Sequence, residues 1–337
     1  MRAVAYKVPQ PISAETSLID VDLPVPEAKG RDLLVEIRAV SVNPVDVKVR
    51  AGVAPTSEEL KVLGWDAAGV VKAIGPEVTL FKVGDEVFYS GVISRAGTNA
   101  EFHLVDERIV GHKPKSLGFA SAAALPLTSI TAYEALFDRL RVHDPVPGAA
   151  RAVLIIGGAG GVGSIAIQIA RALTDLTVIA TASRPETSAW VKELGAHHVI
   201  DHAQPIAAQV AALGLGEPGF VFSTTNTEQH IKEIVDVIAP QGRFALIDDP
   251  KMLDIMPFKR KAASIHWELM FTRPLFGTPD MIEQHKLLEK VAELVDAGKI
   301  RTTLSETLRP INAANLKKAH AMIESGRTKG KLVLEGF

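Results

Sequence analysis

The 337-residue chain contains no cysteine, which excludes disulfide bonds and every metal site that depends on thiolates. This absence also fits a reducing cytoplasm, where we expect the protein to reside. Neither charge sign is in excess, since 37 lysines and arginines face 39 aspartates and glutamates. We therefore expect no nucleic-acid partner and no membrane surface. The first residues lack an apolar core of signal-peptide length, and no internal repeat is present.

Residues 151–171 carry the strongest pattern in the sequence. Ala152–Ile156 is a short, mostly branched apolar run, which is typical of a strand buried on both faces of a parallel sheet. Beyond it, apolar residues recur at helical spacing at Ile165, Ile169 and Leu173. Between the two lie glycines with the G-x-G-x-x-G spacing: Gly158, Gly160 and Gly163. The glycines are therefore expected in a strand-to-helix turn.

Such a turn favours the binding of a dinucleotide, because glycine lets the backbone approach a pyrophosphate and the helix N-terminus offers free N–H groups. Two other interpretations stay open. A glycine turn can be purely structural, and the stretch between Arg151 and Arg171 is uncharged and long enough for a membrane span. Because the glycines divide it into a strand and a helix, we expect the dinucleotide site.

The rest of the chain divides by its pattern of elements. Residues 1–124 show short strand-like runs bounded by glycine and proline, which favours a small barrel-like β domain. From residue 125 to 274, strands alternate with helices, which predicts a doubly wound parallel α/β sheet of the Rossmann type. Residues 275–337 leave this alternation and are expected to return to the first domain. The predicted fold is thus a nucleotide-binding domain inserted in a discontinuous, mainly β domain.

The strand predicted after the glycine turn ends in ATASR, residues 180–184. An acidic residue at this tip commonly binds the ribose 2′-OH of NAD, whereas a basic residue accommodates the 2′-phosphate of NADP. Here Ser183 can donate a hydrogen bond and Arg184 can pair with a phosphate, so we predict NADPH rather than NADH. The alternative is that Arg184 is an ordinary surface arginine. His202, at the end of the next predicted strand, is a further candidate for the same phosphate.

Several pieces together resemble the medium-chain dehydrogenase/reductase superfamily, and within it the zinc-free quinone oxidoreductases, many of which are labelled zinc-type alcohol dehydrogenase-like. The pieces span the whole chain: SVNPVD from Ser41, LGWDAAGVV from Leu63, AAALPLTSITAYEAL from Ala122, the glycine turn, ATASR and the closing GKLVL. The resemblance implies a GroES-like catalytic domain and hydride transfer to quinones or α,β-unsaturated carbonyls. It also implies a homodimer, for which the apolar SIHWELMF from Ser264 is the candidate edge.

The zinc alcohol dehydrogenases of this superfamily hold their metal with a cysteine at the position of Asn43 and a histidine at the position of Trp65. Neither ligand is present, and we expect Asp66 to pair with a basic neighbour instead. We therefore predict no catalytic metal. Without a Lewis acid a simple alcohol is difficult to oxidise, whereas a conjugated acceptor delocalises the electrons of an incoming hydride.

The resemblance also implies contacts with the cofactor. Asn43 and Thr128 are expected near the nicotinamide and its ribose, with a turn residue and a helix cap as the respective alternatives. Thr225, after a predicted strand, and Lys331, in the closing motif, are further candidates; a helix cap and a solvated charge are their alternatives. The pyrophosphate is expected along the glycine turn, at Gly158, Gly160, Gly161, Val162 and Gly163.

Four residues are candidates for the chemistry itself, and Asn43 is one of them. Lys48 replaces a tyrosine of related reductases and can donate a proton, or it is a solvated lysine on a strand. Trp65 can form an apolar wall for a flat substrate, or it is simply buried. Tyr89 can offer its hydroxyl group to a substrate. Two other functions stay open: a zinc-dependent alcohol dehydrogenase, and a NADPH-binding sensor or structural protein with little turnover.

Overall fold

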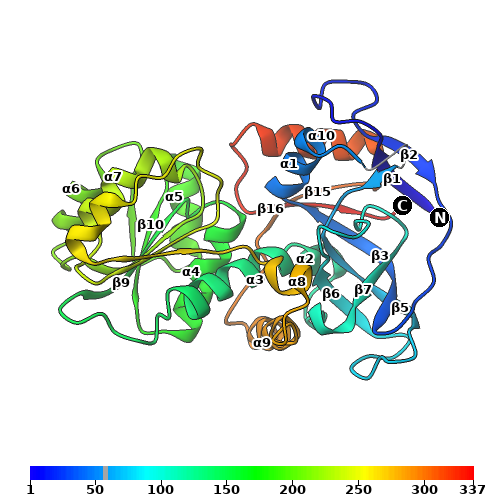
Figure 1. Cartoon of the computed structure of the whole chain (residues 1–337), viewed down its shortest axis with the longest axis horizontal. Coiled ribbons are helices and arrows are strands. Elements are labelled where there is room, and N and C mark those ends of the chain that lie inside the picture. Colours follow the sequence, from blue (N-terminus) through cyan, green and yellow to red (C-terminus); the bar gives the residue numbers. More distant parts are fainter. Residues whose placement is uncertain (56–59) are drawn as a thin grey trace. The chain divides into compact units, whose positions relative to one another are not determined.

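The computed structural model describes residues 1–55 and 60–337. The chain forms two compact units, one made of Met1–Ile130 and Phe271–Phe337 and the other of Thr131–Met270 (Figure 1). The first unit is thus assembled from both ends of the chain. The predicted domain boundaries, after residues 124 and 274, stay a prediction.

The first unit is built around two sheets of mainly antiparallel strands. Its strands are β1 (Arg2–Tyr6), β2 (Ile19–Asp22), β3 (Asp32–Val42), β4 (Lys61–Val62), β5 (Asp66–Ile74), β6 (Glu86–Ser90), β7 (Phe102–Asp106), β8 (Val110–His112), β15 (Leu304–Leu308) and β16 (Lys331–Glu335). The smaller sheet has the order β2-β1-β4, and the larger one β15-β16-β3-β5-β6-β8, with β7 paired to β3. The last strand of the chain, β16, therefore lies beside β3 in the same sheet.

Helices occupy the connections of the first unit. They are α1 (Pro44–Gly52), α2 (Phe119–Ala123), α3 (Pro126–Tyr133), α8 (Thr272–Phe276), α9 (Glu283–Asp296) and α10 (Ala313–Glu324), with a 3₁₀ turn at Glu107–Ile109. Helix α2 ends at Ala123, and α3 begins at Pro126 after a short break. The division between the units, at Ile130, falls inside α3.

Helix α1 corrects one interpretation of the sequence. Pro44 occupies its first turn, where a missing N–H costs nothing, and the Asp46 carboxylate accepts the N–H of the N-cap Asn43 at 2.7 Å. These start signals outweigh the strand-like alternation of valines from Val45 to Val49. The alternative that placed Lys48 on a strand is therefore wrong, because Lys48 is an exposed residue of a helix.

The second unit contains one parallel sheet. Its strands are β9 (Ala150–Ile156), β10 (Thr177–Thr181), β11 (His198–Ile200), β12 (Pro218–Ser223), β13 (Arg243–Leu246) and β14 (Ser264–Trp267). They pair in the order β11-β10-β9-β12-β13-β14, which is the doubly wound Rossmann order. The helices are α4 (Gly161–Leu173), α5 (Pro185–Glu193), α6 (Ile206–Ala212) and α7 (Thr227–Val237), with a π-helix at Glu134–Arg139 and a 3₁₀ segment at Met256–Lys261. The predicted fold class is confirmed.

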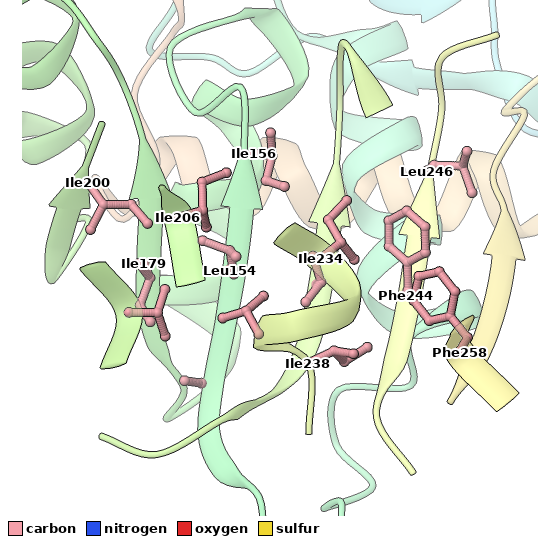
Figure 2. Packing of buried hydrophobic residues seen from close by; sticks show 14 residues of the cluster. Leu154, Ile156, Ile179, Ile200, Ile206, Ile234, Ile238, Phe244, Leu246 and Phe258 are labelled. Atoms are coloured by element: carbon pink, nitrogen blue, oxygen red, sulfur yellow. The ribbon is translucent and has the colours of Figure 1, made fainter. Parts of the chain in front are cut away.

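Both faces of this parallel sheet are covered. Figure 2 shows Leu154 and Ile156 of β9 packed in one cluster with Ile206 of α6 and Ile234 of α7. The intervening residues of β9 are also buried and point to the opposite face, because side chains alternate along a strand. Residues 151–171 therefore form a buried strand and a helix rather than a membrane span. Within the described residues, no helix has the length and apolarity needed to cross a membrane.

Candidate functional site

The glycine turn follows β9 directly and is held by the neighbouring strand β10. The N–H of Gly157 donates to Thr181 Oγ1 at 3.0 Å, and the N–H of Gly158 donates to Thr181 O at 3.1 Å. Gly157 has a φ of +80°, which strains any residue with a side chain, and a Cβ on Gly163 would lie 2.3 Å from Gly157 O. Larger residues do not fit at either position, so α4 packs closely against the turn.

The N-terminus of α4 offers hydrogen-bond donors to an anion. Gly160 is its N-cap, and Gly161, Val162 and Gly163 carry the first N–H groups, which have no acceptor within the helix. A Cβ on Gly160 would find its nearest neighbour at 3.5 Å, so the backbone is accessible there. These features fit the pyrophosphate of a dinucleotide, because the N–H groups and the positive end of the helix dipole both favour negative charge.

The tip of β10 carries the residues predicted to select the cofactor. Ser183 is exposed, and Arg184 is the N-cap residue of α5 with a side chain that is 37% exposed. The Nε atom of Arg184 lies 2.8 Å from a carboxylate oxygen of Glu186, which keeps the guanidinium at this tip. The sequence from Thr181 to Arg184 contains no acid that could bind a ribose 2′-OH.

Two further strand ends border the same turn. His202 follows β11, and its Nδ1 lies 3.2 Å from Thr181 Oγ1. The hydroxyl of Thr224, after β12, donates to Ile156 O at 2.9 Å. Thr225 is exposed and close by, since a Cβ on Gly157 would lie 2.9 Å from its methyl group. Asn226, next to Thr225, is the N-cap residue of α7, so the polar group after β12 also provides the helix cap that was the alternative there.

In the first unit, Asn43, Asp66 and Lys331 form a buried polar cluster. Lys331 Nζ donates to Val42 O at 3.0 Å and to Asn43 Oδ1, and it lies 3.2 Å from Asp66 Oδ2. Asn43 Nδ2 donates to Asp66 Oδ2 at 2.8 Å and to Ser41 O at 3.3 Å. The expected pairing of Asp66 with a basic neighbour is confirmed. The alternative of a solvated Lys331 is wrong, because only 3% of this residue is exposed.

This cluster joins five elements of the first unit. Lys331 opens β16, Asp66 opens β5, and Asn43 lies between β3 and α1. Asp66 Oδ1 also accepts the N–H of Leu127, in α3, at 2.7 Å. Burial raises the pKa of Asp66, and the Lys331 ammonium opposes that rise; burial lowers the pKa of Lys331, and Asp66 opposes that fall. Each group thus compensates the other for the loss of water.

Asp46 belongs to the same cluster, although we did not single it out from the sequence. Burial raises its pKa to about 7, while hydrogen bonding to the Asn43 N–H and the charge of Lys331 lower it, and the charge of Asp66 raises it. Two carboxyl groups and one ammonium thus share this buried space, which is neutral when one carboxyl keeps its proton. The N-x-x-D spacing from Asn43 to Asp46 is the capping pattern that signals this residue.

Trp65 and Tyr89 are fully buried in the first unit, and their polar atoms have partners there. Trp65 Nε1 donates to Val92 O at 3.2 Å. The Tyr89 hydroxyl lies 2.9 Å from His103 Nδ1, and His103 Nε2 lies 3.0 Å from Ala96 O. Because the carbonyl needs a donor, Nε2 carries the proton and the tyrosine donates to Nδ1. Burial lowers the pKa of His103 to about 4, which keeps this histidine neutral.

The structure also shows the place of Asn43 and Thr128, each at the start of a helix. Asn43 is the N-cap of α1 rather than a turn residue. Thr128 lies inside the first turn of α3 and donates its hydroxyl to Leu125 O at 3.1 Å, so it supports the helix start. Both side chains are buried, with exposed fractions of 1% and 2%.

Profiles of two protein families match the chain. The alcohol dehydrogenase GroES-like domain matches residues 29–129, and the zinc-binding dehydrogenase domain matches residues 194–334. A zinc-type alcohol dehydrogenase-like protein of Staphylococcus aureus is 40% identical over 311 residues, which is 92% of each chain. The chain belongs to the medium-chain dehydrogenase/reductase family. The predicted resemblance is confirmed, and the chain is an oxidoreductase of a family that binds nicotinamide cofactors.

Two further members of the medium-chain dehydrogenase/reductase family show the range of related proteins. A crystal structure from Rhizobium etli CFN 42, provisionally named a zinc-dependent alcohol dehydrogenase protein, is 69% identical, with a TM-score of 0.99 over 100% of this chain and 98% of that one. A 2-methylene-furan-3-one reductase of Solanum lycopersicum is 28% identical over 338 residues, covering 96% of this chain and 76% of the relative. The names of the Staphylococcus aureus and Rhizobium etli proteins suggest zinc, whereas the name of the Solanum lycopersicum protein denotes reduction of a conjugated ketone.

The polar cluster around Asn43 does not fit a zinc site. The cluster around Asn43 offers an amide, two carboxyl groups and an ammonium, and neither a thiolate nor an imidazole belongs to it. An ammonium in contact with the acceptor oxygens also repels a second cation. Across residues 1–55 and 60–337, no three histidine, cysteine, aspartate or glutamate side chains are grouped as metal ligands.

Replacing Lys331 with methionine leaves Asp66 buried without its cation, so we expect the free energy of unfolding to fall by about 3–5 kcal/mol. The additional change Asp66→Asn removes the stranded charge. The double variant should therefore lose less than the sum of the two single variants, by about 1–3 kcal/mol. Urea denaturation followed by circular dichroism measures the free energy of unfolding of the unchanged protein, the two single variants and the double variant.

The control for this cycle is Lys299→Met, the same change at an exposed lysine, which should alter the free energy of unfolding by less than about 0.5 kcal/mol. Strictly additive effects of Lys331→Met and Asp66→Asn would contradict the coupling of the two charges.

Proposed function

We propose that this oxidoreductase transfers a hydride from NADPH to quinones or α,β-unsaturated carbonyls without a catalytic metal. The observation that carries the proposal is the cluster around Asn43, the position at which zinc-dependent relatives place a cysteine ligand. There the ammonium of Lys331 already binds the oxygens of Asn43 and Asp66. This set of side chains therefore favours the reduction of an acceptor that needs no Lewis acid.

Conjugated acceptors suit such a site because they delocalise the negative charge that arrives with the hydride. Bound NADPH supplies that hydride from C4 of its nicotinamide. The protein's contribution is then to orient the two reactants, exclude water and supply hydrogen bonds to the developing oxyanion. The name of the conjugated-ketone reductase among the relatives supports this substrate class.

The glycine turn and the tip of β10 support NADPH as the cofactor. We propose that Gly158, Gly160, Gly161, Val162 and Gly163 border its pyrophosphate. In this proposal Ser183 and Arg184 bind the ribose 2′-phosphate. The Ser183 hydroxyl donates a hydrogen bond, and the Arg184 guanidinium donates a charge-assisted one. His202 and Thr225 lie beside the same turn and contribute to the same ligand.

The first unit supplies residues for the nicotinamide end and the substrate. We propose that Asn43 and Thr128 contact the nicotinamide and its ribose, and that Lys331 holds the Asn43 amide in one orientation through its Oδ1 atom. Exposed Lys48 is the candidate proton donor. Trp65 and Tyr89 shape the interior of this unit, because their polar atoms are bonded to Val92 and His103.

We also propose a homodimer formed through β14. This strand ends the six-stranded sheet, pairing only with β13 within the described chain. Trp267, its last residue, and Leu269, two residues further along the chain, are 55% and 51% exposed. A free sheet edge with exposed apolar side chains favours pairing with a second copy. Light scattering should therefore give twice the 36.0 kDa chain mass, and the monomer mass at micromolar concentration would contradict this proposal.

The function is tested by following NADPH consumption with 1,4-benzoquinone, a cyclic enone and a simple aldehyde, on protein whose zinc content is known. We expect turnover of the quinone or the enone without zinc, and weaker use of NADH.

The variant Arg184→Ala tests the proposed contact with the 2′-phosphate. It should raise the dissociation constant of NADPH by about 10-fold or more, because a charge-assisted hydrogen bond contributes about 1.5–3 kcal/mol, and it should leave the dissociation constant of NADH unchanged.

Arg151→Ala is the matched control, since Arg151 pairs with Asp175 at the opposite, amino-terminal end of β9. Turnover of the aldehyde alone, dependent on zinc, would instead favour an alcohol dehydrogenase. Binding of NADPH without turnover of any acceptor would favour a sensor.

A further inference from the structure

Two histidines of the second unit lie together near the strand tip that carries Arg184. His202 follows β11, and His230 lies in the first turn of α7, after β12. Their ring centroids are 6.1 Å apart, and the ring planes meet at 67°. Both side chains are half-buried, and the charge of Arg184 acts on His202. Three groups that can carry positive charge thus gather beyond the carboxyl ends of the strands, where ligands of such sheets bind.

The orientation of His202 is fixed by the residue that also holds the glycine turn. Thr181 Oγ1 accepts the N–H of Gly157 at 3.0 Å and lies 3.2 Å from His202 Nδ1. This contact holds Nδ1 toward Thr181, so Nε2 is on the side of the ring away from Thr181. In the protonated imidazolium Nε2 carries an N–H that can be donated to an anion.

The surroundings of both histidines lower their pKa in the absence of an anion. Burial is the main cause that lowers the pKa of His202, and Arg184 lowers it further against the opposing charge of Asp201. Burial also lowers the pKa of His230, with a further decrease from His202, while Glu233 and Asp248 raise it. These carboxylates are already engaged: Asp201 accepts the N–H of Ala203, Glu233 that of Ala207 and Asp248 that of Thr227, each at 2.8 Å.

We infer that His202 and His230, together with Arg184, form a titratable site for the ribose 2′-phosphate, in which His230 is a further determinant of cofactor selection. The inference rests on the proposed use of NADPH. A phosphate monoester supplies the negative charge that lets both histidines take up protons next to an arginine. Cofactor choice by this enzyme is then coupled to pH.

The direction of this coupling follows from linkage. A bound 2′-phosphate raises the pKa of each histidine, so binding takes up protons and becomes tighter as pH falls. For each proton taken up, affinity for NADPH should increase by up to about tenfold per pH unit between about pH 8 and about pH 6. Below about pH 6 the gain ends, because the phosphate itself becomes protonated. NADH lacks this phosphate, so its affinity should stay nearly constant.

The test is a pH titration of the histidine ring signals by NMR, on the whole protein, with 2′,5′-ADP and with 5′-AMP. We expect 2′,5′-ADP to raise the pKa of His202 and His230, and 5′-AMP to leave both unchanged. Calorimetry should show that the pH dependence of 2′,5′-ADP affinity decreases in His230→Asn. It should persist in His143→Asn, which changes an exposed histidine in the loop before β9.

The outcomes separate this inference from the proposed cofactor. If 2′,5′-ADP binds more tightly than 5′-AMP but moves neither pKa, NADPH selection stands and the histidine site is overturned. The same holds if His230→Asn and His143→Asn behave alike. If 2′,5′-ADP has no advantage over 5′-AMP between about pH 6 and about pH 8, the proposed use of NADPH is overturned as well.

Discussion

The ammonium of Lys331 is buried among oxygens contributed by Val42, Asn43 and Asp66, and much of the first unit depends on this arrangement. A buried cation is costly unless acceptors surround it, and a buried carboxylate is equally costly without a cation. The last strand of the chain, the start of β5 and the start of α1 are therefore held in one place. In this chain an internal ammonium binds at the position that zinc-dependent relatives use for a metal ligand, which connects the stability of the unit to the chemistry we propose.

A second constraint organises the parallel sheet. Gly157 and Gly163 have no room for side chains, and Thr181 accepts the first N–H of the turn between them. The same threonine orients His202, so the pyrophosphate site and the proposed 2′-phosphate site share one support. The glycine turn and the strand tip that we propose for cofactor binding and selection are thus both supported by the end of β10.

The sequence predicts the second unit well because its signals are local. The run Ala152–Ile156, the glycine spacing and the helical period that follows each lie within about a dozen neighbouring residues, and all three are confirmed as β9, its turn and α4. Patterns of this kind depend on strand and helix periods that no distant contact has to complete. The strand that ends just before Ser183 and Arg184 is likewise indicated by local residues and is confirmed as β10.

The first unit shows where local signals are insufficient. Val45 to Val49 alternate like a strand, but Pro44 and the Asp46 cap start a helix there. Lys331 resembles a surface lysine in sequence, and its partner Asn43 is 288 positions away. Asp46 gains its raised pKa only when distant segments bury it beside Asp66. Burial and charge pairing of this kind arise from long-range packing, so the sequence indicates that Asp66 needs a basic partner but not that Lys331 is that partner.

The most direct test of the account is isotope transfer from NADPH deuterated at C4 to a cyclic enone, on protein treated with a chelator and measured to be free of zinc. We expect deuterium at the β-carbon of the saturated ketone, because that carbon receives the hydride. A product that lacks deuterium at this carbon, or deuterium on the carbinol carbon that appears only when zinc is restored, would contradict it.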